Sequence, residues 1–212
     1  MNKYTIFEPA TKEIVIEKSR FICTLSKVHN DVEAQNFIKE MKKKYWDATH
    51  NCSAYVLGQN STAERSNDDG EPSGTAGLPM LEVLRKNSLY DVAAVVTRYF
   101  GGIKLGAGGL IRAYTMSVAE AVQAAGFAQV VEMGHFSFLW NVADVGKVLN
   151  VIYRQQLFKV EDVAYEQRAK LKLLLPVADK DKAEAWLTEA LQQKIGLTEE
   201  SRYGEEQKIT KI

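Results

Sequence analysis

The sequence has few of the residues that mark exported, disulfide-bonded or zinc-binding proteins. It contains two cysteines, Cys23 and Cys52, which cannot form a disulfide framework, and three histidines without a C-x-x-C pair. Its first residues lack the basic and apolar regions of a signal peptide, and no apolar run reaches the roughly 20 residues of a membrane span. We therefore expect a cytosolic protein that has reduced thiols, needs no metal or other cofactor, and does not associate with a membrane.

The sequence also has no excess of either charge. Lysine and arginine total 27, aspartate and glutamate total 27, and the apolar content of 46% is ordinary for a globular protein. A chain without net charge generates no long-range field that would attract nucleic acid. An anionic partner would therefore have to be held by a local basic patch.

One such patch lies in the most glycine-rich stretch, where five glycines fall between positions 101 and 109. An apolar run precedes this stretch, a helical pattern follows it, and all three charged residues from Val92 to Ala119 are basic. The first N–H groups of a helix attract anions, and glycine lets a ligand approach the backbone closely. We therefore predict an anion- or nucleic-acid-binding surface made by Arg98, Gly101, Gly102, Lys104, Gly106, Gly108, Gly109 and Arg112. The alternative is a glycine-rich corner at which helix and strand pack tightly.

Known nucleotide-binding motifs do not fit this stretch. A P-loop ends in Gly-Lys-Ser/Thr, whereas Gly106 is followed by Ala107 and Gly108. A dinucleotide fingerprint starting at Gly106 requires glycine or alanine where Ile111 stands. ATP hydrolysis and nicotinamide chemistry are therefore not expected.

A second dense stretch, NDDGEPSGTAGLPM, places three carboxylates within four positions, those of Asp68, Asp69 and Glu71. Such a turn can supply two oxygens to Mg²⁺, or it can clamp Arg98 or Arg112. Most acidic turns simply face solvent. We predict no dedicated metal site, and retain the three carboxylates as candidate partners of the basic residues or as metal ligands.

The nucleophilic side chains form no catalytic constellation. Ser73 and Thr75 lie in a turn that lacks the Gly-x-Ser-x-Gly pattern. His50 and Cys52 share one strand face, but a spacing of two residues along a strand does not aim a base at a thiol. We therefore expect both to be packed or surface residues, and we predict no catalytic residue.

Periodic apolar patterns predict two domains of the α+β class, over residues 1–128 and 133–212. In the first domain we expect a helix capped by Asn30 and Glu33, a helix closed by Gly126, and strands at 12–17, 20–28, 50–58 and 92–100. The second domain has the order strand, helix, strand, strand, helix, strand, which is that of a ferredoxin-like sandwich. Its elements are expected at 135–141, 143–155, 158–166, 169–176, 181–193 and 196–204.

Five motifs stand in order over roughly residues 1–126: KSRFI (18–22), ATHNCSAY (48–55), DDGEP (68–72), GTAG (74–77) and RYFGGIKLG (98–106). Together they resemble the IMPACT family, in its bacterial YigZ-like branch. The resemblance implies an N-terminal two-layer α/β sandwich with the fold of the second domain of a small-subunit ribosomal protein. It also implies a C-terminal domain similar to the fifth domain of elongation factor G.

The resemblance further implies a link to translation, which eukaryotic members of the family regulate during amino-acid starvation. Likeness of fold alone does not establish a function. The first hypothesis is a cytosolic translation-linked regulator that binds RNA or a ribosome-associated component through the glycine-rich basic loop. The alternatives are a small-molecule hydrolase or phosphate-ester enzyme that uses the acidic turn, and a protein-interaction module whose companion domain docks a partner.

Overall fold

The computed structural model describes residues 4–58 and 63–209, which divide into two units. Unit 1 holds the described residues up to Gln129 together with those from Gln207 on, and unit 2 is Val130–Glu206. The chain thus leaves unit 1 close to the expected boundary but returns to it at its end. There the Lys208 ammonium lies 4.7 Å from the centre of the Phe7 ring. Among the described residues, none of the helices is both long and apolar enough to cross a membrane.

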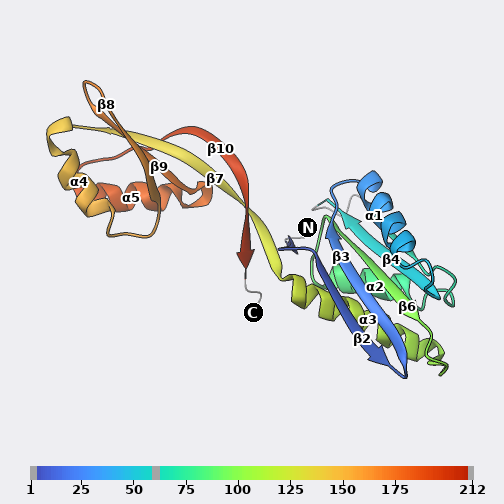
Figure 1. Ribbon diagram of the computed structural model, residues 1–212. Coiled ribbons are helices and arrows are strands. Elements are labelled where there is room, and N and C mark those ends of the chain that lie inside the picture. The colour runs from blue at the N-terminus through green and yellow to red at the C-terminus, as the bar shows by residue number, and fades with distance from the viewer. Residues whose placement is uncertain (1–3, 59–62, 210–212) are drawn as a thin grey trace. The chain divides into compact units, whose positions relative to one another are not determined.

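Unit 1 is built on a five-stranded antiparallel sheet with the strand order β2-β3-β6-β4-β5 (Figure 1). The four apolar strands were expected from their sequence patterns, and the short polar edge strand β5 was not, because its sequence AERSN shows no apolar alternation. The strands are β2 (Ala10–Ile16), β3 (Ser19–Lys27), β4 (His50–Leu57), β5 (Ala63–Asn67) and β6 (Val92–Tyr99).

Three helices cover the two faces of this sheet: α1 (Asp31–Lys44), α2 (Gly77–Lys86) and α3 (Gly106–Ala125). Ala54 and Val56 of β4 belong to the core formed with α2 and α3, whereas Tyr55 and Leu57 alternate into the core beneath α1. The predicted α+β class is therefore confirmed, and α1 adds a third layer to the two that were expected.

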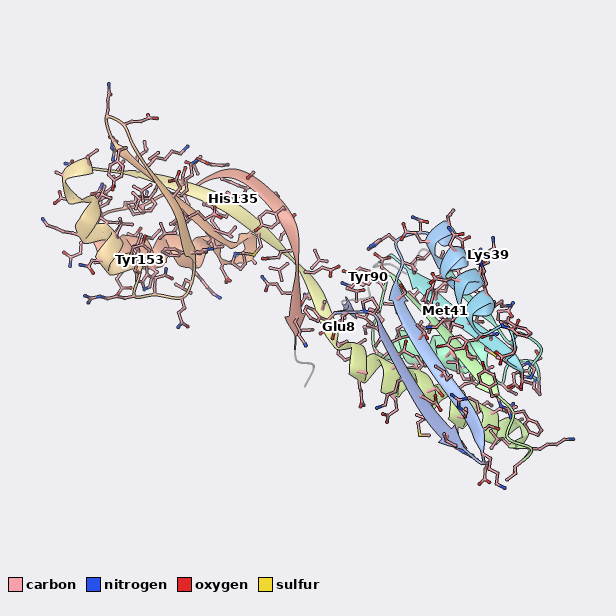
Figure 2. The ribbon with its side chains drawn as sticks, in the orientation of Figure 1. Glu8, Lys39, Met41, Tyr90, His135 and Tyr153 are labelled. Atoms are coloured by element: carbon pink, nitrogen blue, oxygen red, sulfur yellow. The ribbon has the colours of Figure 1, made fainter. Side chains whose placement is uncertain are left out.

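The start of α1 follows from its local sequence. The Asn30 side chain accepts a hydrogen bond from the Glu33 amide at 2.9 Å, and the Glu33 carboxylate accepts one from the His29 amide at 2.8 Å. The first bond satisfies an amide that the first turn of a helix leaves without a partner, and the second holds the residue before the cap. Figure 2 shows Met41 on the sheet side of α1 and Lys39 on its outer side, as the helical periodicity predicts.

Unit 2 has the expected ferredoxin-like order of elements, in which β7 pairs with β9 and β10, and β9 pairs with β8. Residues from α4 and α5 share one core with Phe136, Leu171 and Leu173, so both helices cover the same face. The short strand β1 pairs with the first residues of β7 inside unit 1. The elements are β1 (Thr5–Ile6), β7 (Phe127–Trp140), η1 (Val142–Asp144), α4 (Val145–Ile152), β8 (Lys159–Tyr165), β9 (Ala169–Pro176), η2 (Val177–Asp179), α5 (Lys180–Leu191) and β10 (Thr198–Ile209).

The loop between β6 and α3 contacts the turn between β2 and β3, and Gly101 makes this contact possible. A β-carbon at Gly101 would lie 2.0 Å from the carbonyl carbon of Lys18 and 2.4 Å from the nitrogen of Ser19. The Gly101 amide donates to the Ser19 hydroxyl at 3.1 Å. This glycine is therefore required for close packing, as the alternative of a tightly packed corner predicts.

Gly101→Ala should lower the free energy of unfolding of unit 1 by about 1–3 kcal/mol or more. The added methyl group would push the loop at Gly101 away from the backbone of Lys18 and Ser19. Gly108→Ala is the matched control, since a β-carbon there meets only the flexible end of Arg112, at 3.7 Å. That control should be neutral or stabilise α3 by up to about 1 kcal/mol. Both cysteines of the chain lie in unit 1, so thiol labelling across a urea series measures its unfolding. Equal stability of the two variants would contradict the packing role.

Candidate functional site

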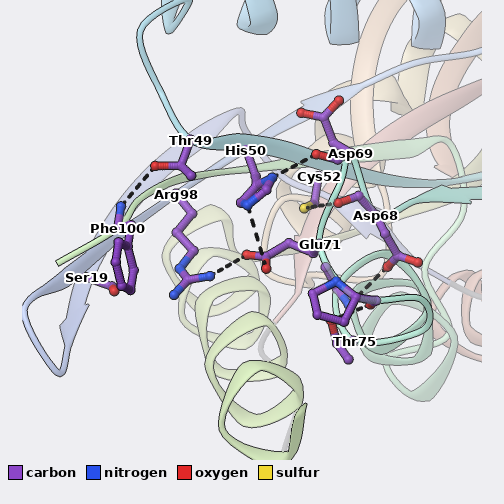
Figure 3. Close-up of polar contacts among 12 residues, drawn as sticks. Ser19, Thr49, His50, Cys52, Asp68, Asp69, Glu71, Thr75, Arg98 and Phe100 are labelled. Carbon is purple, nitrogen blue, oxygen red and sulfur yellow. Dashed lines mark hydrogen bonds and ion pairs between the residues drawn. The ribbon is translucent and has the colours of Figure 1, made fainter. Parts of the chain in front are cut away.

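A buried ion pair joins the end of β6 to the acidic turn that follows β5 (Figure 3). The Arg98 Nη1 donates to the Glu71 Oε1 at 2.6 Å, and the two residues are only 5% and 8% exposed. The Tyr114 hydroxyl, from α3, donates to the same carboxylate oxygen at 2.8 Å. Of the roles considered for the acidic turn, the structure thus shows a clamp on Arg98.

The Arg98 guanidinium also lies close to two aromatic rings. Its central carbon is 5.4 Å from the ring centre of Phe21 and 5.6 Å from that of Phe100, within the range of cation–π attraction. Its Nε is buried, and among residues 4–58 and 63–209 it has no hydrogen-bond partner. The polar network around Arg98 therefore lacks one acceptor.

His50, at the start of β4, faces the same carboxylate. Its Nδ1 lies 2.8 Å from the backbone oxygen of Asp69, and a carbonyl oxygen can only accept, so Nδ1 carries the proton in the neutral ring. This leaves Nε2 as a hydrogen-bond acceptor, 3.8 Å from the Glu71 Oε2 (Figure 3). The arrangement fixes the tautomer of His50 and directs its second nitrogen toward Glu71.

The two aspartates of the acidic turn are already engaged within the protein. The Asp68 carboxylate accepts from the amides of Gly74, Ala76 and Gly77 at 2.7–3.1 Å, and so caps the start of α2. The Asp69 carboxylate accepts from the Asn51 amide at 2.6 Å and pairs with the Lys42 ammonium at 2.5 Å. No group of three or more potential metal ligands occurs among the described residues. Both aspartates thus serve as structural partners inside the protein.

The Arg98 pocket, as we name it, is a hollow of about 390 Å³ beside the buried ion pair. Its lining combines the polar side chains of His50, Glu71 and Arg98 with residues at the start of α3. In the described part of the chain, Leu105, the residue before α3, gives the helix no side-chain cap, and helix geometry leaves the first amides without an acceptor inside the helix. The remaining lining residues are Thr49, Pro72, Phe100, Lys104, Leu105, Gly106, Ala107 and Leu110.

The three predicted cations do not converge on one point. Arg98 and Lys104 line the Arg98 pocket, whereas Lys104 and Arg112 line a second pocket of about 660 Å³ that also contains Glu17 and Gly109. Lys104 and Arg112 are exposed, and Arg98 is buried against Glu71. The predicted surface is thus divided between two neighbouring hollows that share Lys104.

The glycines of the predicted surface also differ in role. The Gly101 amide is occupied by Ser19, so it is not available to a ligand. In a regular helix that begins at Gly106, the Gly109 amide is the first to donate a hydrogen bond within the helix, to the backbone oxygen of Leu105. Gly108 stands in the first turn of α3, whereas Gly106 at the start of the helix has a φ of +67°, and Gly102 lies exposed in the loop with a φ of +87°. Of the five glycines, Gly101 and Gly109 are therefore removed from the set of ligand-binding amides.

Sequence reasoning did not predict that Tyr114 contacts Glu71, or that His50 and Phe100 line the Arg98 pocket. Tyr114 falls on the buried apolar stripe of its helix, and nothing in that periodicity reveals that its hydroxyl reaches Glu71. The Cys52 thiol has two acceptors within reach, the Asp68 carbonyl at 2.9 Å and the Tyr114 hydroxyl at 3.3 Å. Burial raises the pKa of the Cys52 thiol to about 12 and raises the pKa of Tyr114 far above its usual value, so both stay protonated.

Comparison with known proteins places this site in a recognised domain. Residues 17–122 match the model of the Impact N-terminal domain, and residues 143–194 match that of a domain of unknown function, DUF1949. The IMPACT family member YvyE of Bacillus subtilis is 48% identical over 199 residues, covering 92% of this chain and 90% of its own. The chain belongs to the IMPACT family. All polar residues of the Arg98 pocket lie within the matched N-terminal domain.

Two further relatives agree with this assignment. The IMPACT family member YigZ of Escherichia coli is 41% identical over 117 residues, covering 54% of this chain and 57% of its own, which fits the YigZ-like branch. The crystal structure of a hypothetical protein is 29% identical with a TM-score of 0.59 and covers 92% of this chain and 95% of that one. The two-domain α+β fold is therefore shared over nearly the whole chain.

Breaking the buried pair from either side should strongly destabilise unit 1. Glu71→Gln and Arg98→Met should each lower its free energy of unfolding by about 3–5 kcal/mol, since each leaves an uncompensated buried partner. The double variant should lose clearly less than the sum, because neither charge then remains. Thiol labelling in urea measures all three, and Glu13→Gln, which breaks the exposed Glu13–Arg20 pair, is the control that should change little. Strict additivity would show that the two side chains do not act together.

Neither cysteine should react with iodoacetamide in the native protein at pH 8, because both are buried and burial raises the pKa of each thiol. In denaturant both should react, since an exposed cysteine has a pKa of about 8.5. A pKa that is higher in the folded state means that stability falls as the pH rises past about 8.5, where only the unfolded thiols ionise. Mass spectrometry after labelling counts the modified thiols. Native labelling at the unfolded rate would contradict the burial of these thiols.

Proposed function

We propose that this IMPACT family member is a translation-linked regulator that binds RNA or a ribosomal component through the basic loop Gly102–Arg112. Membership of the family supports the link to translation. One structural observation supports the binding surface: α3 begins with no acidic residue in its first turn, while the exposed side chains of Lys104 and Arg112 flank that turn. Unpaired amides and two cations form an environment that favours phosphate oxygens.

The distribution of charge supports local rather than global attraction. The chain as a whole carries no net charge, so RNA would be held by the basic loop and not by a field around the molecule. Glu17 lines the second pocket together with Arg112 and limits its positive potential. We therefore expect modest affinity that depends on salt, as is usual when phosphate contacts provide most of the binding.

The contacts of the acidic turn do not favour the alternative of a small-molecule hydrolase or phosphate-ester enzyme that uses this turn. Asp68 caps α2, Asp69 pairs with Lys42, and Glu71 pairs with Arg98, so each carboxylate has a structural partner. The third hypothesis, a protein-interaction module, stays a prediction for the companion domain. If RNA does not bind, it becomes the leading hypothesis for this protein.

The test compares Lys104→Ala/Arg112→Ala with the wild type for binding to a short single-stranded RNA. Fluorescence anisotropy across a KCl series gives the slope of log K against log salt, which should become shallower by about 1.4 if two phosphate contacts are lost. The matched control is Lys39→Ala/Lys43→Ala, which removes two exposed lysines from α1. That control should keep the wild-type slope. An unchanged slope and affinity in the loop variant would rule out the basic loop as the binding surface.

A further inference from the structure

The Arg98 pocket has features that a surface for internal RNA phosphates does not require. It is a defined hollow of about 390 Å³, within the range of small-molecule sites, and its polar side is formed by nearly buried side chains. We propose that the Arg98 pocket binds a phosphate monoester of mononucleotide size, either a free nucleotide or the phosphorylated 5′ end of an RNA. This deepens the proposed function and rests on it for the role of the start of α3.

The phosphate end of the ligand is assigned to the first turn of α3. Gly106 and Ala107 line the pocket, and their amides have no acceptor inside the helix. Lys104 lines the same wall and supplies a cation. A phosphate monoester presents three terminal oxygens and close to two negative charges near neutral pH, so it suits several donors at a helix start better than a bridging phosphate does.

The polar side of the Arg98 pocket selects a different chemical group. Arg98 is neutralised by Glu71, so this side attracts no second anion. With His50 in its neutral form, it offers two acceptors instead, the Nε2 of His50 and the Oε2 of Glu71, which lie 3.8 Å apart. Hydroxyl or amino groups of the ligand can donate to both, as those of a ribose or a base do.

The apolar part of the lining indicates an organic ligand rather than inorganic phosphate. Phe100 is 47% exposed, its ring centre lies 5.6 Å from the guanidinium carbon of Arg98, and it borders the pocket together with Leu105 and Leu110. These apolar walls suit the body of a nucleotide, since bases stack on aromatic rings.

The test uses Ala107→Asp, with Ala107→Asn as the isosteric control. Ala107 is exposed in the first turn of α3 and lines the Arg98 pocket. A carboxylate in a first helical turn favours the helix, so the aspartate variant should fold, but its charge repels a phosphate. Adenosine 5′-monophosphate and adenosine are the paired small probes, and isothermal calorimetry up to millimolar ligand measures their affinities.

The wild type should bind adenosine 5′-monophosphate at least about ten-fold more tightly than adenosine, and Ala107→Asp should abolish most of that difference while Ala107→Asn keeps it. Equal affinity for the two probes, no binding of either, or an unchanged difference in Ala107→Asp would overturn the proposal. Thermal unfolding of both variants confirms that each is folded before binding is compared.

A second arm identifies the source of the phosphate monoester. Two short RNAs of one sequence are compared, one with a 5′-phosphate and one with a 5′-hydroxyl. Tighter binding of the phosphorylated RNA, displaced by adenosine 5′-monophosphate, assigns the pocket to an RNA end; equal binding of the two RNAs assigns it to a free nucleotide. The salt slope of the 5′-hydroxyl RNA reports on the basic loop alone, so failure of the proposed function and failure of the pocket proposal give different results.

Discussion

The buried pair of Arg98 and Glu71 is the interaction on which the rest of the site depends. It joins the end of β6 to the acidic turn, and through Glu71 it reaches Tyr114 on α3 and faces His50 on β4. The Glu71 carboxylate thus links the acidic turn to three other elements, β4, β6 and α3. Since each charge is costly to bury without the other, the geometry of this corner is fixed by their mutual neutralisation.

This constraint also explains where the unpaired positive charge of the loop lies. Arg98 contributes little free charge, because Glu71 neutralises it, and the exposed positive groups are Lys104, Arg112 and the first amides of α3. Of these groups, Lys104 and the start of α3 line the Arg98 pocket together with His50 and Glu71. Such a lining suits a ligand that carries both an anionic group and hydrogen-bond donors, rather than a uniform polyanion.

Local patterns predicted much of the fold, and they failed where a partner comes from a distant element. Alternation along β4 and β6 and the cap at Asn30 are properties of single segments, and they were confirmed. Helix α2 was missed because Ala76 offers no local cap, and its amides are satisfied instead by Asp68, eight or nine residues earlier in the chain. The sequence left open which partners the carboxylates of the acidic turn have, and the structure places those partners on α1, α2 and β6.

By itself, the sequence determined the family, the two α+β domains and the presence of a glycine-rich basic loop, because these follow from motif order and from periodicity within single elements. Only the tertiary structure decided that Gly101 serves packing, that Arg98 faces Glu71 and not solvent, and that Lys104 lies between two hollows. The physical reason is that backbone geometry sets the pattern within a helix or strand, whereas the pairing of buried charges depends on which elements pack together.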